Sequence, residues 1–325
     1  MKPTVNAVIA CLLAIVPTSS VCSAPWDKVV FQDDFSLTSP DGGPDPQKWV
    51  INVPEEWWWV QGRTFYPSSV YHPAGPFPKV DNGICTLEHH SYNPYDLAQE
   101  HWTLLGGQIR TVEEFGTAGA YRFEAILRCG EYPSGLVTSF FTYGFDGLNS
   151  DEIDFEFVSK KNNEDPRSDG DWVLTNTWNE SMQKPSWVWV PGLDLTQWNC
   201  FRIYWHVGQR VDWTWLANPE DETSEVLLRT ETDSFHIPDQ PMGLYSNSWA
   251  AVSGWPEAYS SDLQPVSVPQ LDQVLNFGLD DVNVSVPEPT SAALVAIGLF
   301  AISCRRRHSR STSGSGTRQG GRSEG

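Results

Sequence analysis

A seven-residue run near the middle of the chain alternates acidic and apolar side chains at a period of two. Residues 151–157 read Asp-Glu-Ile-Asp-Phe-Glu-Phe. This alternation predicts a β-strand with one face in a core and one face open. Ile153, Phe155 and Phe157 would point into the core, so the strand must belong to a sheet that covers an apolar interior on one side only.

Three carboxylates, Glu152, Asp154 and Glu156, would share the other face of this strand. Like charges on one strand face repel, and the run contains no basic residue to offset them. An isolated acidic strand can be an edge that charge protects from aggregation. Here aromatic, β-rich flanks favour a chemical role instead. Two glutamates around an aspartate can supply the nucleophile and the proton donor of retaining glycoside hydrolysis.

The spacing of the two glutamates adds a geometric condition. Residues i and i+4 of a flat strand have Cα atoms about 13 Å apart, whereas the carboxyl groups of a retaining pair lie roughly 5–5.5 Å apart. The hypothesis therefore requires a curved sheet on which the two side chains lean toward each other.

Short apolar-alternating runs separated by Gly, Pro, Asn and Asp recur along the chain, without long helical periodicity. The runs cover residues 29–35, 84–89, 106–112, 121–127, 137–143, 201–207, 211–216 and 275–284. This spacing predicts an all-β sandwich or barrel.

The central run resembles the catalytic strand of glycoside hydrolase family 16, whose pattern is Glu-x-Asp-x-Glu, or Glu-x-Asp-x-x-Glu with a bulge. The unbulged form here is similar to the lichenase and xyloglucan endotransglycosylase branches. The resemblance implies that Glu152 is the nucleophile and Glu156 the general acid/base. It gives Asp154 the task of holding the nucleophile and tuning the pair.

Other segments carry the resemblance over most of residues 29–285. They are residues 29–35, 106–110, 119–124 and 135–143, the last of which is similar to the lichenase strand before the catalytic one. The implied fold is a concanavalin-like β-jelly-roll sandwich whose concave face holds the substrate cleft.

The resemblance also implies a set of substrate-binding residues, for each of which a place in the core is the alternative. They are Arg110, Phe141, Tyr143, Asn176, Trp178, Asn247, Trp249 and Trp255. Asn247 and Trp249 match an Asn-x-Trp pattern on the acceptor side. Gln108 replaces a family Glu, and Trp178 stands where lichenases often have Tyr.

Two segments have no family counterpart. Trp57, Trp58 and Trp59 would either extend the cleft or cover a core edge, with Trp58 opposing the other two in a strand. Residues 162–171 are polar and predict a loop.

Composition narrows the class of ligand. The formal net charge is −20, and seven of the 21 basic residues are Lys2 and the six arginines from Arg305 onward, so the region between the two ends is more acidic still. Nucleic acids and sulfated glycans are disfavoured as partners, and a neutral polysaccharide fits better. All 16 tryptophans lie between Trp26 and Trp255, enough to provide flat surfaces for sugar rings.

Cysteine and metal signals are weak. Cys85, Cys129 and Cys200 lie outside the two terminal segments and can form one disulfide with a free thiol, or be three buried thiols. The resemblance implies that Asp281, in the last strand, can bind a structural Ca²⁺, with an ordinary edge aspartate as the alternative. The chemistry itself needs no cofactor.

The two ends predict export. Residues 1–24 have the charge, apolar core and small residues of a signal peptide, and residues 25–285 form the predicted catalytic domain. Residues 286–308 begin Val-Pro-Glu-Pro, continue as a short apolar run and end in an arginine cluster. They resemble a PEP-CTERM signal, which implies exosortase-type processing and membrane contact through this segment alone. Residues 309–325 have a disordered composition.

We therefore expect an exported, monomeric endo-glycoside hydrolase at the cell surface or outside the cell, with a mixed-linkage β-1,3/1,4-glucan as first choice of substrate. Two alternatives stay open. A transglycosylase would use the same covalent intermediate, and a lectin-like jelly roll would bind glycan without turnover.

Overall fold

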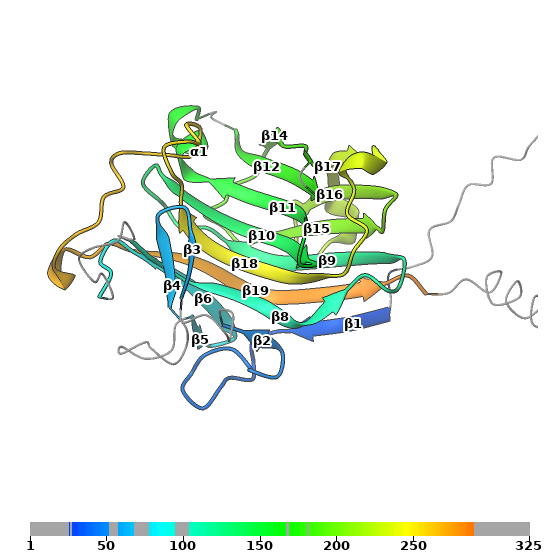
Figure 1. Ribbon diagram of the computed structural model, residues 1–325, viewed down its shortest axis with the longest axis horizontal. Coiled ribbons are helices and arrows are strands. Elements are labelled where there is room, and N and C mark those ends of the chain that lie inside the picture. The colour runs from blue at the N-terminus through cyan, green and yellow to red at the C-terminus, as the bar shows by residue number, and fades with distance from the viewer. Residues whose placement is uncertain are drawn as a thin grey trace, which may run out of the picture. The chain divides into compact units, whose positions relative to one another are not determined.

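The computed structural model describes residues 26, 28–51, 58–67, 78–94, 104–166, 169–180 and 182–288, with only the backbone of residues 58–60. Trp26–Pro287 form one compact unit built from two packed β-sheets (Figure 1). The predicted signal peptide, Trp57 and the chain from residue 289 onward lie outside the described residues, as do the side chains of Trp58 and Trp59.

The first sheet has eleven strands within the described ranges. Nine follow the order β17 (Glu225–Glu231), β16 (Arg210–Leu216), β15 (Asn199–His206), β9 (Ala120–Arg128), β19 (Val274–Val286), β6 (Ile84–His90), β7 (Leu104–Gly106), β4 (Thr64–Pro67) and β3 (Trp58–Gln61). β1 (Lys28–Asp33) pairs with β19, and β5 (Lys79–Asp81) pairs with β6.

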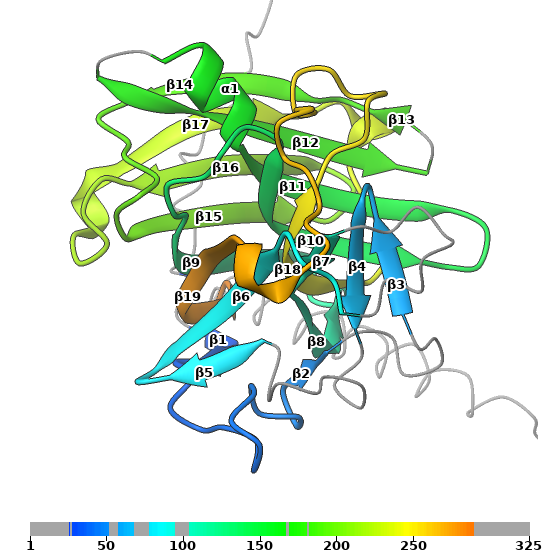
Figure 2. The ribbon, with the colours of Figure 1, turned by 90° about the vertical axis from the view of Figure 1, so that its left-hand side faces the viewer.

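The second sheet has eight strands in the same described part of the chain. Seven follow the order β13 (Met182–Gln183), β12 (Gly170–Asn179), β11 (Ser150–Val158), β10 (Leu136–Phe145), β18 (Met242–Ala250), β8 (Gln108–Phe115) and β2 (Trp49–Val50). β14 (Ser186–Pro191) pairs with β12. Figure 2 shows the β3–β4 hairpin standing beside β10 and β18.

The acidic run forms β11, between β10 and β12, as its alternation predicts. Ile153, Phe155 and Phe157 enter the core between the sheets. Phe201, from β15 of the other sheet, lies 5.1 Å from the Phe155 ring centroid and 4.9 Å from that of Phe157. Pairing with β10 and β12 continues without a register shift, so the strand is unbulged. The core contacts fix which face of β11 presents the carboxyl groups.

Two expected boundaries need correction. The first predicted strand, residues 29–35, ends at Asp33, because the backbone N–H of Phe35 bonds to the Asp33 carboxylate at 3.2 Å and Phe35 adopts a φ of +50°. The predicted loop at 162–171 begins inside a short helix, α1 (Ser159–Glu164), and ends in β12. Asn162 holds this helix to β12 by exchanging two hydrogen bonds with the Trp172 backbone, at 2.7 and 3.1 Å.

Of the two alternatives for the cysteines, a disulfide with one free thiol or three buried thiols, the structure shows the second. Cys85, Cys129 and Cys200 are free, buried thiols. Burial raises the pKa of each, and that of Cys129 reaches about 12. They therefore behave as small apolar core residues rather than as reactive groups.

Candidate active site

The three carboxyl groups of β11 share the face of the eight-stranded sheet that points away from the core, which we call the carboxylate face. Glu152 and Glu156 are partly exposed, whereas Asp154 between them is 2% exposed. Asp154 pairs in register with Asn176 on β12 and with Phe141 on β10. The cross-strand neighbours of the central carboxyl group are thus an amide and an aromatic ring.

Burial raises the pKa of all three carboxyl groups. For Glu156 burial and the negative charge of Glu152 raise the pKa to about 8. Burial raises the pKa of Asp154 well above its usual range, and Glu152 adds to the shift. The pKa of Glu152 is also raised by burial, against which a hydrogen bond from Asp154 acts. Three acids this close cannot all ionise. The directions of these pKa shifts favour a charged Glu152 that accepts a hydrogen bond from Asp154, beside a protonated Glu156.

Strand register brings the predicted binding residues onto the same face, in rows that cross the sheet. The Asp154 row contains Asn176, Phe141, Tyr245 and Arg110. The Glu152 row contains Trp178 and Tyr143. The Glu156 row contains Ser139, Asn247 and Gln108. Residues that are up to 139 positions apart in sequence therefore surround the carboxyl groups.

Accessibility divides these residues into two groups. Arg110, Tyr143 and Trp178 are partly exposed. Asn247 is fully buried and Trp249 is 8% exposed, although both lie on the carboxylate face. Trp255 packs on Trp249 with ring centroids 5.7 Å apart. Arg110, Tyr143 and Trp178 are thus open to a ligand and Trp255 is partly exposed, whereas the buried predicted residues are Phe141, Asn176, Asn247 and Trp249.

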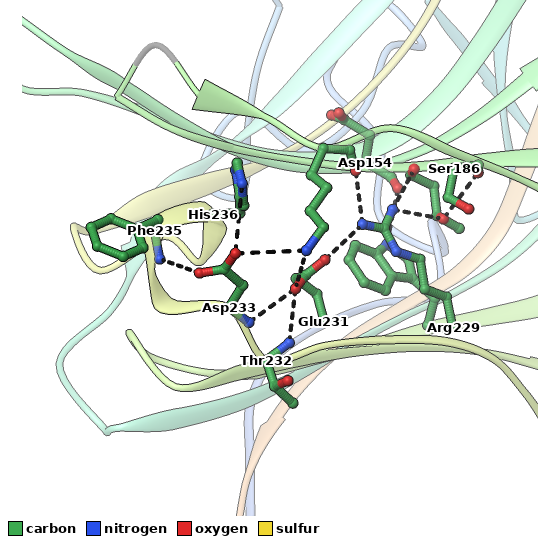
Figure 3. A network of polar contacts seen from close by, with 11 residues as sticks. Asp154, Ser186, Arg229, Glu231, Thr232, Asp233, Phe235 and His236 are labelled. Atoms are coloured by element: carbon green, nitrogen blue, oxygen red, sulfur yellow. Dashed lines mark hydrogen bonds and ion pairs between the residues drawn. The ribbon is translucent and has the colours of Figure 1, made fainter.

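A polar network on the core side supports the backbone of the central carboxylate residue (Figure 3). The indole N–H of the buried Trp213, from β16, donates to the backbone carbonyl of Asp154 at 2.9 Å. The Arg229 guanidinium lies 4.7 Å from the Trp213 ring centroid. Arg229 also donates to the backbone carbonyl of Thr175 on β12, at 2.8 Å. Trp213 thus holds the backbone of β11, and Arg229 holds the backbone of β12.

The charge of this arginine is balanced locally. Glu231 accepts hydrogen bonds from Arg229 and Lys184, each at 3.0 Å, and from the backbone N–H of Asp233 at 2.9 Å. Burial raises the pKa of Glu231, but these bonds outweigh it and lower the pKa to about 2. Arg229 therefore supports β12 while its charge is neutralised by Glu231.

Sequence reasoning missed several residues of this site. Tyr245 stacks on Phe141 at 5.2 Å between ring centroids, and Trp187 lies in register with Leu174, which itself pairs with Glu156. Trp213 and Gln61 were also missed. Alternation within their own strands shows which neighbours share a face with Tyr245 and Trp187. Whether that face is the carboxylate face follows only from the pairing of strands that are distant in sequence.

The predicted metal residue Asp281 lies on β19, in the other sheet. It is partly buried, its Oδ2 accepts from Asn283 at 3.1 Å, and its Oδ1 has no hydrogen-bond partner among the described residues. Asn283 Oδ1 is likewise unpartnered there. No cluster of three His, Cys, Asp or Glu side chains in the described ranges could hold a metal ion. A carboxylate and an amide oxygen together still suit Ca²⁺ when carbonyls complete the shell.

Two cavities in the described part of the molecule lie away from the carboxyl groups. Their volumes are about 350 and 470 Å³, and the backbone and side chains of residues 129–132 line both. Neither is lined by Glu152, Asp154 or Glu156, so we do not place the site there.

Comparison with known families identifies two segments of the chain. Residues 83–262 match the model of glycosyl hydrolases family 16, and residues 285–307 match the PEP-CTERM protein-sorting motif. The chain therefore belongs to glycosyl hydrolases family 16 and is a glycoside hydrolase. The sorting motif marks it as an exported protein directed to the cell surface. No helix in the described residues is long and apolar enough to cross a membrane.

Solved structures agree with the fold. A β-1,3-1,4-glucanase (lichenase) from a mouse hindgut metagenome is 20% identical, with a TM-score of 0.52, over 79% of this chain and 98% of that one. The Bacillus licheniformis β-glucanase is 19% identical, with a TM-score of 0.51 over 79% and 97%. An endo-1,3-β-glucanase (laminarinase) domain from Thermotoga petrophila is 14% identical, with a TM-score of 0.55 over 80% and 98%. A sequence search of curated proteins finds no match.

The Trp213 contact generates a first prediction, with Trp205 as matched control. Trp205 is equally buried and donates to the Pro238 carbonyl at 2.9 Å. Replacing either residue by Phe removes a buried hydrogen bond worth about 1–3 kcal/mol of folding free energy, so both variants should melt earlier. Only Trp213→Phe should also lower kcat, by about tenfold or more, because a small shift of Asp154 misaligns the reacting groups. Equal kcat losses in both variants would show that Trp213 acts through stability alone.

Proposed function

We propose that the carboxylate face performs retaining hydrolysis of a neutral β-linked glucan, with a mixed-linkage β-1,3/1,4-glucan as first choice. The observation that carries the proposal is that the surroundings of the three carboxyl groups favour a protonated Glu156 next to an ionised Glu152. Glu156, with a pKa raised to about 8, is an acid at neutral pH, whereas Glu152 can be the anion. Retaining hydrolysis needs one group of each kind.

In the proposed reaction the Glu152 carboxylate attacks the anomeric carbon while Glu156 transfers its proton to the departing glycosidic oxygen. A glycosyl ester on Glu152 forms and the leaving sugar is released. Glu156, now ionised, removes a proton from water, and the resulting hydroxide displaces Glu152 from the sugar. Asp154 donates to Glu152 and so holds the nucleophile in place.

The substrate is inferred from several features together. The chain is strongly acidic, at −20, which disfavours a sulfated glycan. Aromatic side chains at Tyr143 and Trp178 flank Glu152 in register. The structures similar to this chain include a lichenase and a laminarinase. Export and cell-surface sorting place such an enzyme where it meets polysaccharide.

The substrate and nucleophile can be tested together. We expect reducing-sugar release from one neutral glucan in a panel of lichenan, laminarin, xyloglucan, agarose and carrageenan. Glu152→Gln should reduce the rate by at least about a thousandfold. Glu113→Gln, which changes an exposed glutamate on β8, should leave the rate unchanged. A first product with α rather than β configuration would exclude double displacement, and products longer than the donor would indicate transfer to sugar.

The raised pKa of Glu156 predicts a basic limb in the pH profile. kcat/KM should fall as pH rises through about 8, because Glu156 loses the proton that the leaving group needs. With an aryl glycoside whose leaving group needs no proton, Glu156→Gln should still form the glycosyl ester, without this basic limb. A limb that persists in the variant would assign it to another group.

Stability should depend on the same proton. Because the folded pKa of Glu156 exceeds its ordinary 4.5, the protonated group favours folding at low pH, and that contribution is lost as pH rises from about 4.5 to about 8. The melting temperature of Glu156→Gln should therefore exceed that of the wild type at pH 9 more than at pH 5.

We further propose that Asp281 contributes to a structural Ca²⁺ site, supported by the unpartnered oxygens of Asp281 and Asn283. Calcium chloride should raise the melting temperature of the wild type, because binding to the folded state alone stabilises it. Asp281→Ala should abolish this rise, whereas Asp280→Ala, at the exposed neighbouring residue, should keep it. The same response in both variants would exclude a site at Asp281.

A further inference from the structure

The β3–β4 hairpin begins with Trp58 and Trp59, two of the three consecutive tryptophans that have no family counterpart. The tip of the hairpin is hydrogen-bonded to β18. The backbone N–H of Arg63 donates to the Ala250 carbonyl at 2.8 Å, and the Ala250 N–H donates to the Thr64 hydroxyl at 2.8 Å. The Arg63 guanidinium donates to the carbonyls of Ala251 and Leu263, at 2.9 and 2.8 Å. These bonds give the hairpin tip a fixed position against β18.

Gly62 lets the tip approach closely. Its φ is +60°, and a Cβ there would lie 2.2 Å from the Ala250 carbonyl oxygen and 2.9 Å from Cε3 of Trp249. Any other residue would therefore clash with the strand and with the indole. This contact, with Trp255 on the same ring system, leaves Trp249 almost without exposed surface.

Gln61 covers Asn247, another of the predicted substrate-binding residues. The Asn247 Nδ2 group donates to Gln61 Oε1 at 2.8 Å and to Gln108 Oε1 at 3.1 Å. The Tyr66 hydroxyl also points to Gln61 Oε1, at 3.4 Å. Asn247 is fully buried under these contacts, whereas Gln61 is partly exposed. Asn247 and Tyr66 occupy the Gln61 carbonyl, so the group of this partly exposed side chain that is left to bind a ligand is its amide NH2.

The position of Gln61 relative to the carboxyl groups follows from the register. Asn247 lies in the Glu156 row, with Ser139 between them. Two strand spacings of roughly 4.8 Å separate β11 from β18, so the Asn247 backbone lies about 10 Å from that of Glu156. That distance is within reach of an oligosaccharide bound at the carboxyl groups, but beyond the bond being cleaved.

We propose that Gln61 is a specificity-determining residue that donates a hydrogen bond from its amide to a glucan hydroxyl, and that Asn247 positions it. The inference rests on the proposed glucan hydrolysis and adds a contact that the hairpin supplies. A neutral amide donor suits an uncharged sugar. Asn247, covered by Gln61, serves the glucan through Gln61 rather than by touching it.

Chain-length dependence tests the proposal, because Gln61 can help only a substrate long enough to reach it. We would measure kcat and KM for β-glucan oligosaccharides of increasing length with wild type, Gln61→Met and Gln61→Glu. Met keeps the length of the side chain without hydrogen bonds. Glu keeps the acceptor for Asn247 but has no donor for the sugar. Gln209→Met, on the exposed turn between β15 and β16, is the control.

Both Gln61 variants should lose about threefold to tenfold in kcat/KM on the longer oligosaccharides, mainly through KM, as expected for one neutral hydrogen bond. The shortest substrates that are cleaved, and all substrates of Gln209→Met, should be unaffected. An equal loss at every length, no loss at all, or full rescue by Gln61→Glu would overturn the proposal in favour of a purely structural Gln61.

Binding separates failure of this inference from failure of the proposed function. Oligosaccharide affinity would be measured by calorimetry in the Glu152→Gln background, with and without Gln61→Met. Weaker binding of long oligosaccharides with Gln61→Met supports the contact even where turnover is slow. Unchanged binding overturns the Gln61 contact alone, whereas a wild-type protein that neither binds nor cleaves any glucan overturns both.

Discussion

Burial of three carboxyl groups on one strand face, with no cation acting on them among the described residues, is the constraint on which the site depends. Glu231, on β17 of the eleven-stranded sheet, shows the contrast. Its pKa falls to about 2 because Lys184, Arg229 and a backbone N–H all bond to it, whereas that of Glu156 rises to about 8. At neutral pH, Glu231 is therefore ionised, whereas Glu156 keeps its proton. The surroundings therefore decide which glutamate can donate a proton.

Such a cluster disfavours folding, so the strand that carries it needs strong support from its other face. Phe155 and Phe157 provide it by packing on Phe201 of the opposite sheet. Trp213 adds a directed contact to the Asp154 carbonyl. Unbroken pairing with β10 and β12 prevents a slip that would turn the acids inward. The packing of one face of β11 in the core therefore fixes the positions of the carboxyl groups on its other face.

Local pattern was sufficient for this strand and for the all-β class, because period-two alternation states directly which side chains are buried. It was insufficient where a side chain outside the repeating pattern decides the backbone. Asp33 ends β1 by bonding to the Phe35 N–H, and Asn162 turns an expected loop into a helix end bound to β12. Trp213 and Gln61 were beyond local reasoning altogether, since their partners lie 59 and 186 residues away in sequence.

The hairpin shows why residue identity does not transfer function by itself. Asn247 and Trp249 stand at the positions that the family resemblance assigns to substrate, yet they are covered by Gln61, Gly62 and Trp255. Gln61 and Gly62 follow directly on Trp57–Trp59, the run for which the sequence offers no family counterpart. Conversely, Gln61 gains its orientation from Asn247. In the proposed arrangement, a residue at a family binding position acts by supporting Gln61, so specificity could change without any change in the carboxylate residues of β11.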